Sequence, residues 1–388
     1  MSAPVRLALV AGEHSGDQLG AGLIRELRAR LPGAEFFGVA GPRMTAAGCA
    51  PWASSERLAV MGLFEVVRHL PDLMKLRGEI TRRFIEARPD VFVGVDAPEF
   101  NLGLARRLRE AGIRTVQYVS PQVWAWRSGR VRGIARSVDS VLCLLPFEVD
   151  FYRNAGVHAE FVGHPLADQI PLSPDRASAR TRLGLTERPT VAVLPGSRMG
   201  EVSRLGEVFA QTIAWLNERR PDLQFVAPMA SRPVREKFEL ALQRHAAAIP
   251  VRLADGDAQT ALAAADAVIV ASGTATLETL LSKRPMVVAY RLGALTAWLV
   301  RTFNLMKAPY FSQPNLLAGR LVVREFFQEA VTPEALGSEI VRLLDDAAGR
   351  AEIERLFTEI HHRMRQGASE RAAQAVMSLL PGAGRAGQ

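Results

Sequence analysis

The sequence predicts an α/β protein with two domains, each a doubly wound parallel β-sheet covered by helices on both faces. Short apolar runs alternate with amphipathic segments along the chain, which is typical of βαβ units. The alternation pauses around residues 164–175, and 388 residues are enough for two domains. We therefore expect domains at 1–165 and 166–349, with C-terminal helices over 350–380 packing back on the first domain.

The first half supplies five candidate strands, each a short apolar run of the kind buried in a parallel sheet. These strands are expected at Val5–Ala11, Phe36–Ala40, Val91–Asp96, Thr115–Ser120 and Ser140–Leu145. Between them the apolar spacing predicts helices near 17–31, 64–87, 100–112, 129–137 and 147–155.

A short amphipathic segment at 176–183 separates the halves, and the strand–helix rhythm restarts at Pro189. Strands are expected at Thr190–Leu194, Gln224–Pro228, Val251–Ala254, Ala267–Ala271 and Met286–Tyr290. Helices are expected near 201–219, 233–247, 258–265, 275–283 and 333–346.

The composition favours an anionic partner and a reducing compartment. The formal net charge is +8, which suits nucleic acid, an acidic membrane surface or phosphorylated substrates. The two cysteines, Cys49 and Cys143, form no C-x-x-C pair, so neither a zinc site nor a disulfide framework is indicated. The first apolar run is too short for a signal peptide, and no run is long enough to span a membrane.

The stretch at 266–281, DAVIVASGTATLETLL, is the clearest candidate for a binding site. An apolar strand is followed by Ser272, Gly273 and Thr274 and then by a helical pattern. A strand, a small-residue turn and a helix aim free N–H groups at an anion. Glu278, one turn into the helix, could accept hydrogen bonds from a ribose. A nucleotide site is one interpretation, and an ordinary α/β crossover is the other.

A second loop suited to phosphate follows the first strand of the second half. It contains Gly196, Ser197 and Arg198, and glycine permits close approach while arginine pairs with phosphate oxygens. The alternative is a tight turn with a solvated arginine. Neither loop matches G-x-x-x-x-G-K-[ST], and the G-x-G-x-x-G fingerprint is absent, so a P-loop NTPase and a nicotinamide oxidoreductase are not indicated.

Asp96 is the leading candidate for a catalytic base because it ends an apolar strand at a carboxyl-end loop. The alternative is a capping box in which Asp96, with Glu99 three residues later, opens a helix. Glu13 and His14, in the loop after the first strand, are further catalytic candidates. Asp255 and Asp257 resemble a metal-binding pair, but a surface turn explains them better, and we expect no metal.

The segment 60–84 departs from the α/β pattern, because apolar residues are dense in it and basic residues are interleaved. It could contact a membrane interface or an acyl chain, or it could be a crossover helix whose Arg and Lys side chains reach water. Trp124, Trp126 and Arg127 are aromatic and basic together, which can indicate base stacking. No nucleic-acid module accompanies them, so a phosphorylated or lipidic substrate is preferred and no nucleic-acid partner is expected.

Seven motifs, taken together, resemble the lipid-A-disaccharide synthase family. They run in order over nearly the whole chain, and several are eight or more residues long. They are VAGEHSGDQLGAGLI (10–24), GVAGPRM (38–44), DVFVGVDAPEFN (90–101), YVSPQVWAWR (118–127), LPGSR (194–198), ASGTATLE (271–278) and PNLLAGR (314–320).

The resemblance implies an inverting glycosyltransferase of the GT-B type, with two Rossmann-like domains facing across a cleft. Such an enzyme joins UDP-2,3-diacylglucosamine to 2,3-diacylglucosamine 1-phosphate in a β(1→6) linkage and releases UDP. It implies lipopolysaccharide synthesis in a bacterium and peripheral association with the cytoplasmic face of the inner membrane. No cofactor is expected, and a homodimer is a further expectation.

The resemblance also assigns roles to residues. Asp96 becomes the leading general base for the acceptor hydroxyl, with Glu13 and His14 beside it. The expected UDP contacts are Gly196, Ser197, Arg198, Ser272, Gly273, Thr274, Thr276, Glu278 and Asn315. The expected acceptor and lipid contacts are Ser15, Met61, Leu63, Phe64, Val67, Leu70, Trp124, Trp126 and Arg127. A UDP-sugar epimerase of the same fold and a non-catalytic nucleotide- or lipid-binding protein are the alternatives.

Overall fold

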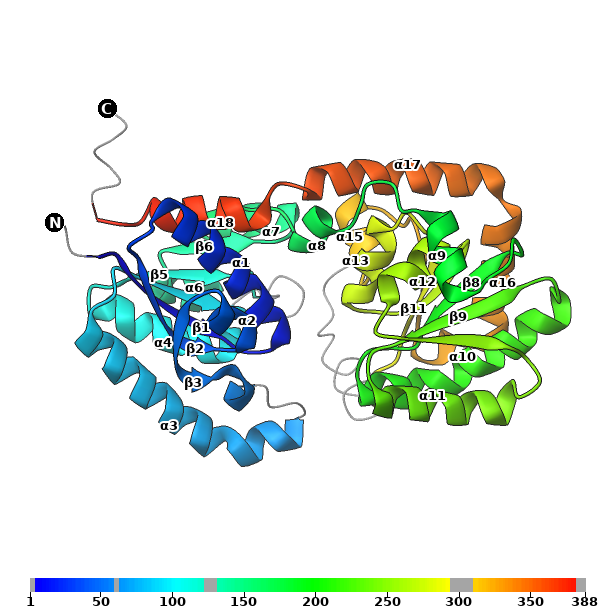
Figure 1. Ribbon diagram of the computed structural model, residues 1–388, viewed down its shortest axis with the longest axis horizontal. Coiled ribbons are helices and arrows are strands. Elements are labelled where there is room, and N and C mark those ends of the chain that lie inside the picture. Colours follow the sequence, from blue (N-terminus) through cyan, green and yellow to red (C-terminus); the bar gives the residue numbers. More distant parts are fainter. Residues whose placement is uncertain (1–3, 59–62, 122–130, 294–309, 382–388) are drawn as a thin grey trace. The chain divides into compact units, whose positions relative to one another are not determined.

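The computed structural model describes residues 4–58, 63–121, 131–293 and 310–381, without the side chains of 63–69. The chain divides into two compact units (Figure 1). Unit 1 combines Met1–Pro165 with Met364–Gln388, and unit 2 is Leu166–Arg363. The chain passes from unit 1 to unit 2 between Pro165 and Leu166.

Unit 1 is built on a parallel sheet whose strand order, in the described residues, is β3-β2-β1-β4-β5-β6-β7. The strands are β1 (Arg6–Ala11), β2 (Glu35–Ala40), β3 (Cys49–Ser54), β4 (Val91–Val95), β5 (Arg114–Tyr118), β6 (Ser140–Cys143) and β7 (Ala159–Phe161). The helices are α1 (His14–Arg30), α2 (Pro42–Ala46), η1 (Ser55–Leu58), α3 (Leu63–Ala87), α4 (Pro98–Glu110), α6 (Val131–Ser137), α7 (Pro146–Arg153) and α18 (Ala368–Met377).

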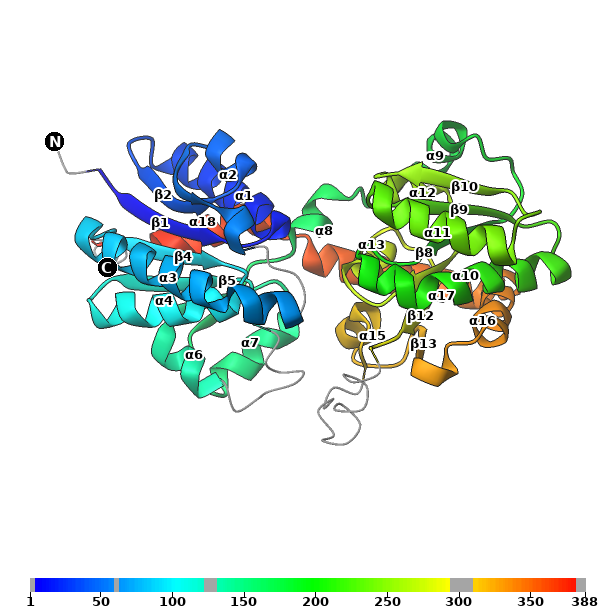
Figure 2. The same cartoon turned by 90° about the horizontal axis from the view of Figure 1, so that it is seen from below.

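Helices cover both faces of this sheet, which explains why β1 and β4 at its centre are almost entirely apolar. α1 and α18 pack side by side over one face, where Leu23 and Val376 enter the core (Figure 1). α3, α4, α6 and α7 line the other face around Phe84 and Phe92 (Figure 2). β4, in the middle, is buried at every position.

Unit 2 repeats the design with the strand order β10-β9-β8-β11-β12-β13 in its described residues. The strands are β8 (Thr190–Leu194), β9 (Gln224–Met229), β10 (Val251–Asp255), β11 (Ala267–Ala271), β12 (Met286–Tyr290) and β13 (Arg324–Phe327). The helices are α8 (Pro165–Gln169), α9 (Arg176–Leu183), α10 (Met199–Arg219), α11 (Arg232–His245), α12 (Ala258–Ala264), α13 (Thr274–Leu281), α15 (Gln313–Ala318), η3 (Gln328–Ala330), α16 (Pro333–Asp345) and α17 (Ala347–Met364).

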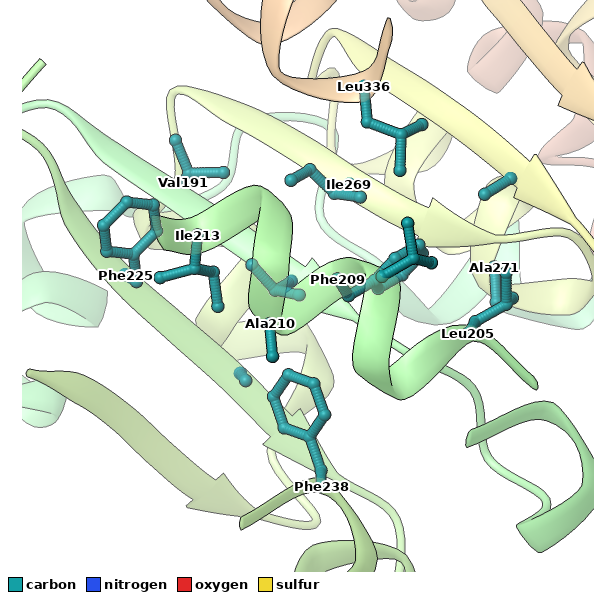
Figure 3. Close-up of a cluster of buried hydrophobic side chains, with 14 of the residues drawn as sticks. Val191, Leu205, Phe209, Ala210, Ile213, Phe225, Phe238, Ile269, Ala271 and Leu336 are labelled. Atoms are coloured by element: carbon teal, nitrogen blue, oxygen red, sulfur yellow. The ribbon is translucent and has the colours of Figure 1, made fainter. Parts of the chain in front are cut away.

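The core of unit 2 lies between the sheet and α10, α11 and α16. Phe209 and Ile213 of α10 point toward the strand residues Val191, Phe225 and Ile269 (Figure 3). Burying side chains of this size contributes roughly 1.5–3 kcal/mol each. This core therefore holds the strands of unit 2 in register and fixes where their ends emerge.

Several short elements of the described residues were not expected from the sequence, among them three edge strands and the helices α2, α8 and α15. The three edge strands are β3, β7 and β13. Each carries polar residues or proline, so it lacks the continuous apolar run by which the central strands could be recognised. Over 350–380, where helices were expected to pack on the first domain, α18 packs against α1 in unit 1. α17 buries Phe357 and Ile360 and is grouped with unit 2, so the chain returns to unit 1 at Met364.

Candidate functional site

In unit 1, polar loops meet where the strand order reverses between β1 and β4. These neighbouring strands pair in register from Leu7↔Val91 to Ala11↔Val95, and their following loops leave the same edge of the sheet. A Cβ placed on Gly12 would lie 2.7 Å from the Cβ of Ala97, so the two loops are in contact. Such a reversal point is where α/β sheets commonly bind ligands.

Asp96 lies directly after β4 in an unusual backbone conformation. Its φ angle is +53°, and that of Ala97 is +41°. Consecutive left-handed residues that are not glycine are strained, and such strain tends to occur at functional sites. The strand expected to include Asp96 therefore ends at Val95. The N-cap of α4 is Ala97 and has no side-chain cap, so Asp96 does not occupy the cap position of the alternative hypothesis.

Two fully buried amides hold the main chain of Asp96. The Asp96 N–H donates to the Tyr118 carbonyl at 2.8 Å. The Asp96 carbonyl accepts from Asn101 Nδ2 at 2.8 Å and from Gln117 Nε2 at 3.0 Å. Sequence reasoning missed both amides. Polar residues within an apolar helix face and an apolar strand were the signal that could have found them.

The loop after β1 brings the other catalytic candidates to the same edge. Glu13 is the N-cap residue of α1, and His14 and Ser15 are exposed in the first turn of that helix. A Cβ on Gly16 would lie 3.7 Å from the Cβ of Asp96, so the first turn of α1 adjoins Asp96. The structure therefore brings Glu13, His14 and Ser15 to the region of Asp96, and their roles stay predictions.

In unit 2 both expected phosphate loops emerge at the equivalent reversal point. β8 and β11 are neighbours, paired from Val191↔Ala267 to Leu194↔Val270. The loop at 196–198 follows β8, and the turn at 272–276 follows β11. The two candidate anion-binding segments, separated by about 75 residues in the chain, thus leave one edge of one sheet.

The loop after β8 is shaped by glycine and by an internal carboxylate. Gly196 has a φ angle of +126°, and a Cβ there would lie 2.4 Å from the Cβ of Glu201. Glu201 Oε2 accepts from the N–H groups of Ser197 at 2.8 Å and Arg198 at 3.2 Å. These two N–H groups therefore already have an anionic partner, and the exposed Arg198 side chain is what this loop offers a phosphate.

The turn after β11 is open. Gly273, the N-cap of α13, is exposed with a φ angle of +145°, and Thr274 beside it is also exposed. N–H groups in the first turn of a helix lack intrahelical partners, so this end of α13 can receive an anion. Thr276 is buried instead, and its hydroxyl donates to the Gly273 carbonyl at 2.8 Å. Thr276 shapes the turn from behind.

Glu278 lies half-buried in α13, one turn beyond the open end of the helix. Burial raises the pKa of the Glu278 carboxyl above its ordinary value. A partly desolvated carboxylate gains from a donor that approaches it. A pair of ribose hydroxyls would supply such donors.

Asn315 supports the same region from inside the protein. Its Nδ2 donates to the Val323 carbonyl and to Glu325, each at 2.8 Å, and its Oδ1 accepts from two backbone N–H groups. The side chain is fully buried. α15 adjoins α13 through the Gln313 N–H, which donates to Thr276 Oγ1 at 3.4 Å. The structure therefore places Asn315 behind the turn, where it anchors α15 to β13.

An aromatic group beside the open turn was missed by sequence reasoning. The ring of Tyr290, at the end of β12, lies 5.6 Å from that of Phe311 and 5.8 Å from that of Phe327. Ser272 Oγ donates to the Phe311 carbonyl at 3.4 Å, which ties this group to the turn. Aromatic residues at the ends of two strands were the available signal.

The helix α3 combines both interpretations of the segment 60–84. Leu76, Ile80 and Phe84 are buried against the sheet, as a crossover helix requires, and the helix continues through Pro71. Leu70 and Met74 are 50% and 48% exposed. The helix thus packs on the sheet through one set of apolar side chains and presents others, such as Leu70 and Met74, to solvent.

Several expected contacts lie outside the described residues or side chains. They are Met61, Leu63, Phe64, Val67, Trp124, Trp126 and Arg127.

Asp255 and Asp257, the pair that resembled metal ligands, are both described, and each forms an ion pair with an arginine. Asp255 pairs with Arg235 at 2.8 Å, and Asp257 caps α12 and pairs with Arg182 at 2.6 Å. Within the described residues, no helix is both long and apolar enough to cross a membrane.

Comparisons with known proteins agree on one family. Residues 7–378 match the family described as lipid-A-disaccharide synthetase. The chain is 53% identical over 383 residues to the lipid-A-disaccharide synthase of Alkalilimnicola ehrlichii, covering 98% of this chain and 100% of that protein. It is also 53% identical over 381 residues to the lipid-A-disaccharide synthase of Pseudomonas aeruginosa, covering 98% and 99%.

Solved structures show the fold. A putative UDP-N-acetylglucosamine 2-epimerase from Listeria monocytogenes superposes with a TM-score of 0.65 at 13% identity, covering 97% of this chain and 96% of that one. Anabaena Alr3699/HepE in complex with UDP-glucose gives 0.57 at 13% identity, covering 96% and 99%. The two Rossmann-like units form a GT-B fold. The chain belongs to the lipid-A-disaccharide synthase family, glycosyltransferases of lipid A biosynthesis.

Proposed function

We propose that the protein transfers the 2,3-diacylglucosamine group of UDP-2,3-diacylglucosamine to the 6-hydroxyl of 2,3-diacylglucosamine 1-phosphate. The products are the β(1→6)-linked disaccharide 1-phosphate and UDP. The observation that carries this proposal is the pairing of β8 with β11, which brings Arg198 and the turn at 272–276 to one sheet edge. An arginine side chain and an open helix N-terminus at one place suit the diphosphate of a nucleotide.

Unit 2 binds the nucleotide in this proposal. The open first turn of α13 receives the diphosphate, since its N–H groups and the helix dipole favour negative charge. Arg198 pairs with the same phosphates, and Glu278 accepts hydrogen bonds from the ribose. Thr276 and Asn315 hold the turn in shape. The UDP-glucose bound to the Anabaena relative by fold supports this choice of ligand class.

Asp96 of unit 1 acts as the general base. Its carboxylate takes the proton of the acceptor hydroxyl while the oxygen attacks the anomeric carbon of the donor. The bond from that carbon to the β-phosphate oxygen breaks, and the configuration inverts in the single displacement. The negative charge that develops on UDP is stabilised by Arg198 and the end of α13. No metal or cofactor takes part in this scheme.

Leu70 and Met74 of α3 contact a membrane surface or the acyl chains of the substrates. The excess of basic residues favours anionic lipid at the cytoplasmic face of an inner membrane. Replacing Leu70 and Met74 together by serine is expected to reduce binding to vesicles of phosphatidylglycerol without lowering the midpoint of thermal unfolding. Unchanged vesicle binding would contradict this part of the proposal.

UDP release, measured with both acylated substrates in detergent micelles, tests the function. We expect release only when donor and acceptor are present together, and unchanged release after treatment with EDTA. Consumption of the donor without the acceptor would indicate an epimerase or a hydrolase. UDP binding without any turnover would indicate a nucleotide-binding protein.

A further inference from the structure

Three residues with positive φ angles, none of them glycine, gather at the ends of β4 and β5. They are Asp96, Ala97 and Val119, and the φ angle of Val119 is +77°. A β-branched residue is a genuine outlier there. The strained residues directly follow β4 and β5, which are neighbours paired up to Val95↔Tyr118. The three residues therefore lie together at one edge of the sheet.

The amide of Gln117 touches both strained segments. Its Nε2 donates to the Asp96 carbonyl at 3.0 Å and to the Val119 carbonyl at 3.3 Å. Asn101 Nδ2 donates to the Asp96 carbonyl at 2.8 Å and to the Val10 carbonyl at 3.2 Å, which links it to β1 as well. The two amide groups thus hold the ends of three neighbouring strands.

The orientation of the two amides follows from their surroundings. The groups that they face are main-chain carbonyl oxygens, which can only accept, so each NH2 group must point toward them. Among the described atoms, Asn101 Oδ1 and Gln117 Oε1 are buried and accept no hydrogen bond. A buried acceptor without a donor is destabilising. What the two side chains contribute in this structure is the set of hydrogen bonds that their NH2 groups donate to the main chain.

Gly94 makes room for the pair. A Cβ at this position in β4 would lie 2.8 Å from the Cβ of Asn101 and 3.0 Å from Gln117 Oε1. Glycine inside a strand often marks such a close approach. β4, β5 and α4 each contribute one member, so the cluster is built into the fold and does not depend on a surface loop.

We propose that Asn101 and Gln117 are positioning residues, which hold Asp96 in its left-handed conformation and so fix the direction in which its carboxylate leaves the backbone. This inference rests on the proposed role of Asp96 as the general base. Without the two amides, the chain at Asp96 would relax toward an ordinary conformation. The carboxylate would then lose its alignment with the acceptor hydroxyl, while the nucleotide site of unit 2 would be untouched.

The test replaces each amide by an apolar side chain of similar shape, as Asn101→Leu and Gln117→Met. We expect kcat for UDP release to fall by about 10- to 100-fold, because small misplacements of a reacting group have effects of this size. The dissociation constant for UDP should stay within about twofold of the parent value. Thr115→Val is the matched control, since Thr115 is equally buried at the opposite end of β5 and bonds to Ser137 and Asp139.

A second-site change separates positioning from folding. Ala97→Gly makes the left-handed conformation easier to adopt, so in the Asn101→Leu background it should recover kcat by about fivefold. In the Asp96→Asn background, Asn101→Leu should reduce kcat by no more than about twofold further, because a residue acting through Asp96 has nothing left to position.

Unchanged kcat in both amide variants would overturn the proposal. So would a loss of kcat that the Thr115→Val control matches at equal loss of thermal stability, or one that Ala97→Gly does not relieve. If Asp96→Asn itself keeps the parent kcat, then the assignment of the base in the proposed function fails. If the parent protein releases no UDP with both substrates, the proposed reaction fails.

Discussion

At the reversal point of each sheet, a loop contains residues with positive φ angles, but the two units stabilise this conformation in different ways. In unit 2 the left-handed or extended turns fall on glycine, with φ angles of +126° at Gly196 and +145° at Gly273. In unit 1 the equivalent turn falls on Asp96 and Ala97, and buried amides hold it. The unit 2 turns are permitted by the residue type, whereas the unit 1 turn is imposed by its neighbours.

Under the proposed function, this difference follows from what each turn has to present. A phosphate is bound by main-chain N–H groups, and glycine allows a ligand to approach them closely. A general base must offer a side chain, so glycine cannot serve at its position. The strain at Asp96 is then the cost of combining a tight turn with a carboxylate, and the surrounding fold must offset it.

The largest effect is expected from Asp96→Asn, which removes the base and keeps the shape of the side chain. We expect kcat to fall by about 10³-fold, since general-base catalysis contributes about 10² to 10⁴. The affinity for UDP should change by less than about twofold. Kinetics of UDP release and calorimetric titration with UDP measure the two quantities.

Asp90→Asn is the control at the other end of β4, where Asp90 Oδ2 accepts from the Arg6 N–H at 2.8 Å. It should cost stability without a comparable loss of kcat. Equal losses of kcat in the two variants would remove the distinction between a catalytic end and a structural end of this strand.

Next in size is Gly273→Ala, which tests whether the unit 2 turn depends on glycine. The protein leaves open space around a Cβ at this position, so any effect comes from the backbone angle and not from a clash. Residues other than glycine cost about 1–3 kcal/mol in such a conformation, so UDP should bind about tenfold more weakly. Calorimetric titration with UDP measures the change.

Gly184→Ala is the matched control, because Gly184 has a φ angle of +66° and equally open surroundings at the end of α9. It should lower the midpoint of thermal unfolding and leave UDP affinity unchanged. If Gly273→Ala also affected only the midpoint, the open turn would not be part of the nucleotide site.

The same contrast explains what the sequence could predict. The two parallel sheets followed from the alternation of apolar runs, because buried central strands leave a continuous apolar signal. Ser272, Gly273 and Thr274 could be selected because glycine and small residues mark a turn in the sequence itself. The edge strands β3 and β13 carry mixed residues and left no such signal.

The supporting residues could not be predicted because their roles depend on partners distant in the chain. Gln117 lies 21 residues from Asp96, and its amide is meaningful only once β5 lies beside β4. Glu201 was not expected to occupy the N–H groups of Ser197 and Arg198. Asn315 was expected near the nucleotide, but its burial behind the turn depends on contacts with β13.

A smaller effect is expected from Glu278→Gln, which separates the nucleotide function of unit 2 from its stability. The neutral amide should weaken UDP binding by about fivefold, because hydrogen bonds to a charged group are stronger by about 1 kcal/mol than those to a neutral one. Because the amide carries no charge, the substitution should also remove the loss of stability that comes from burying a carboxylate. Thermal unfolding at several pH values distinguishes the two effects.

The sign of the pH effect follows from the raised pKa of Glu278. The folded chain holds this proton more tightly than the unfolded chain, so the contribution of the group to stability is present at low pH and is lost as the pH rises through the folded-state pKa. Glu278→Gln should therefore unfold at a higher temperature than the parent at about pH 8, and the gap should close toward about pH 4. A gap that widens toward acid would contradict the burial argument.

The smallest effect is expected from Ala97→Gly in the otherwise unchanged chain, and it tests the contrast between the turns most directly. If neighbours impose the left-handed conformation on Ala97, glycine should relieve strain there and raise the free energy of unfolding by up to about 1 kcal/mol. Ala105→Gly, on the buried face of α4, is the control and should lower it by at least about 1 kcal/mol. Chemical denaturation measures both. Equal destabilisation by the two changes would mean that the turn at Asp96 is not strained, and that unit 1 and unit 2 shape their loops in the same way.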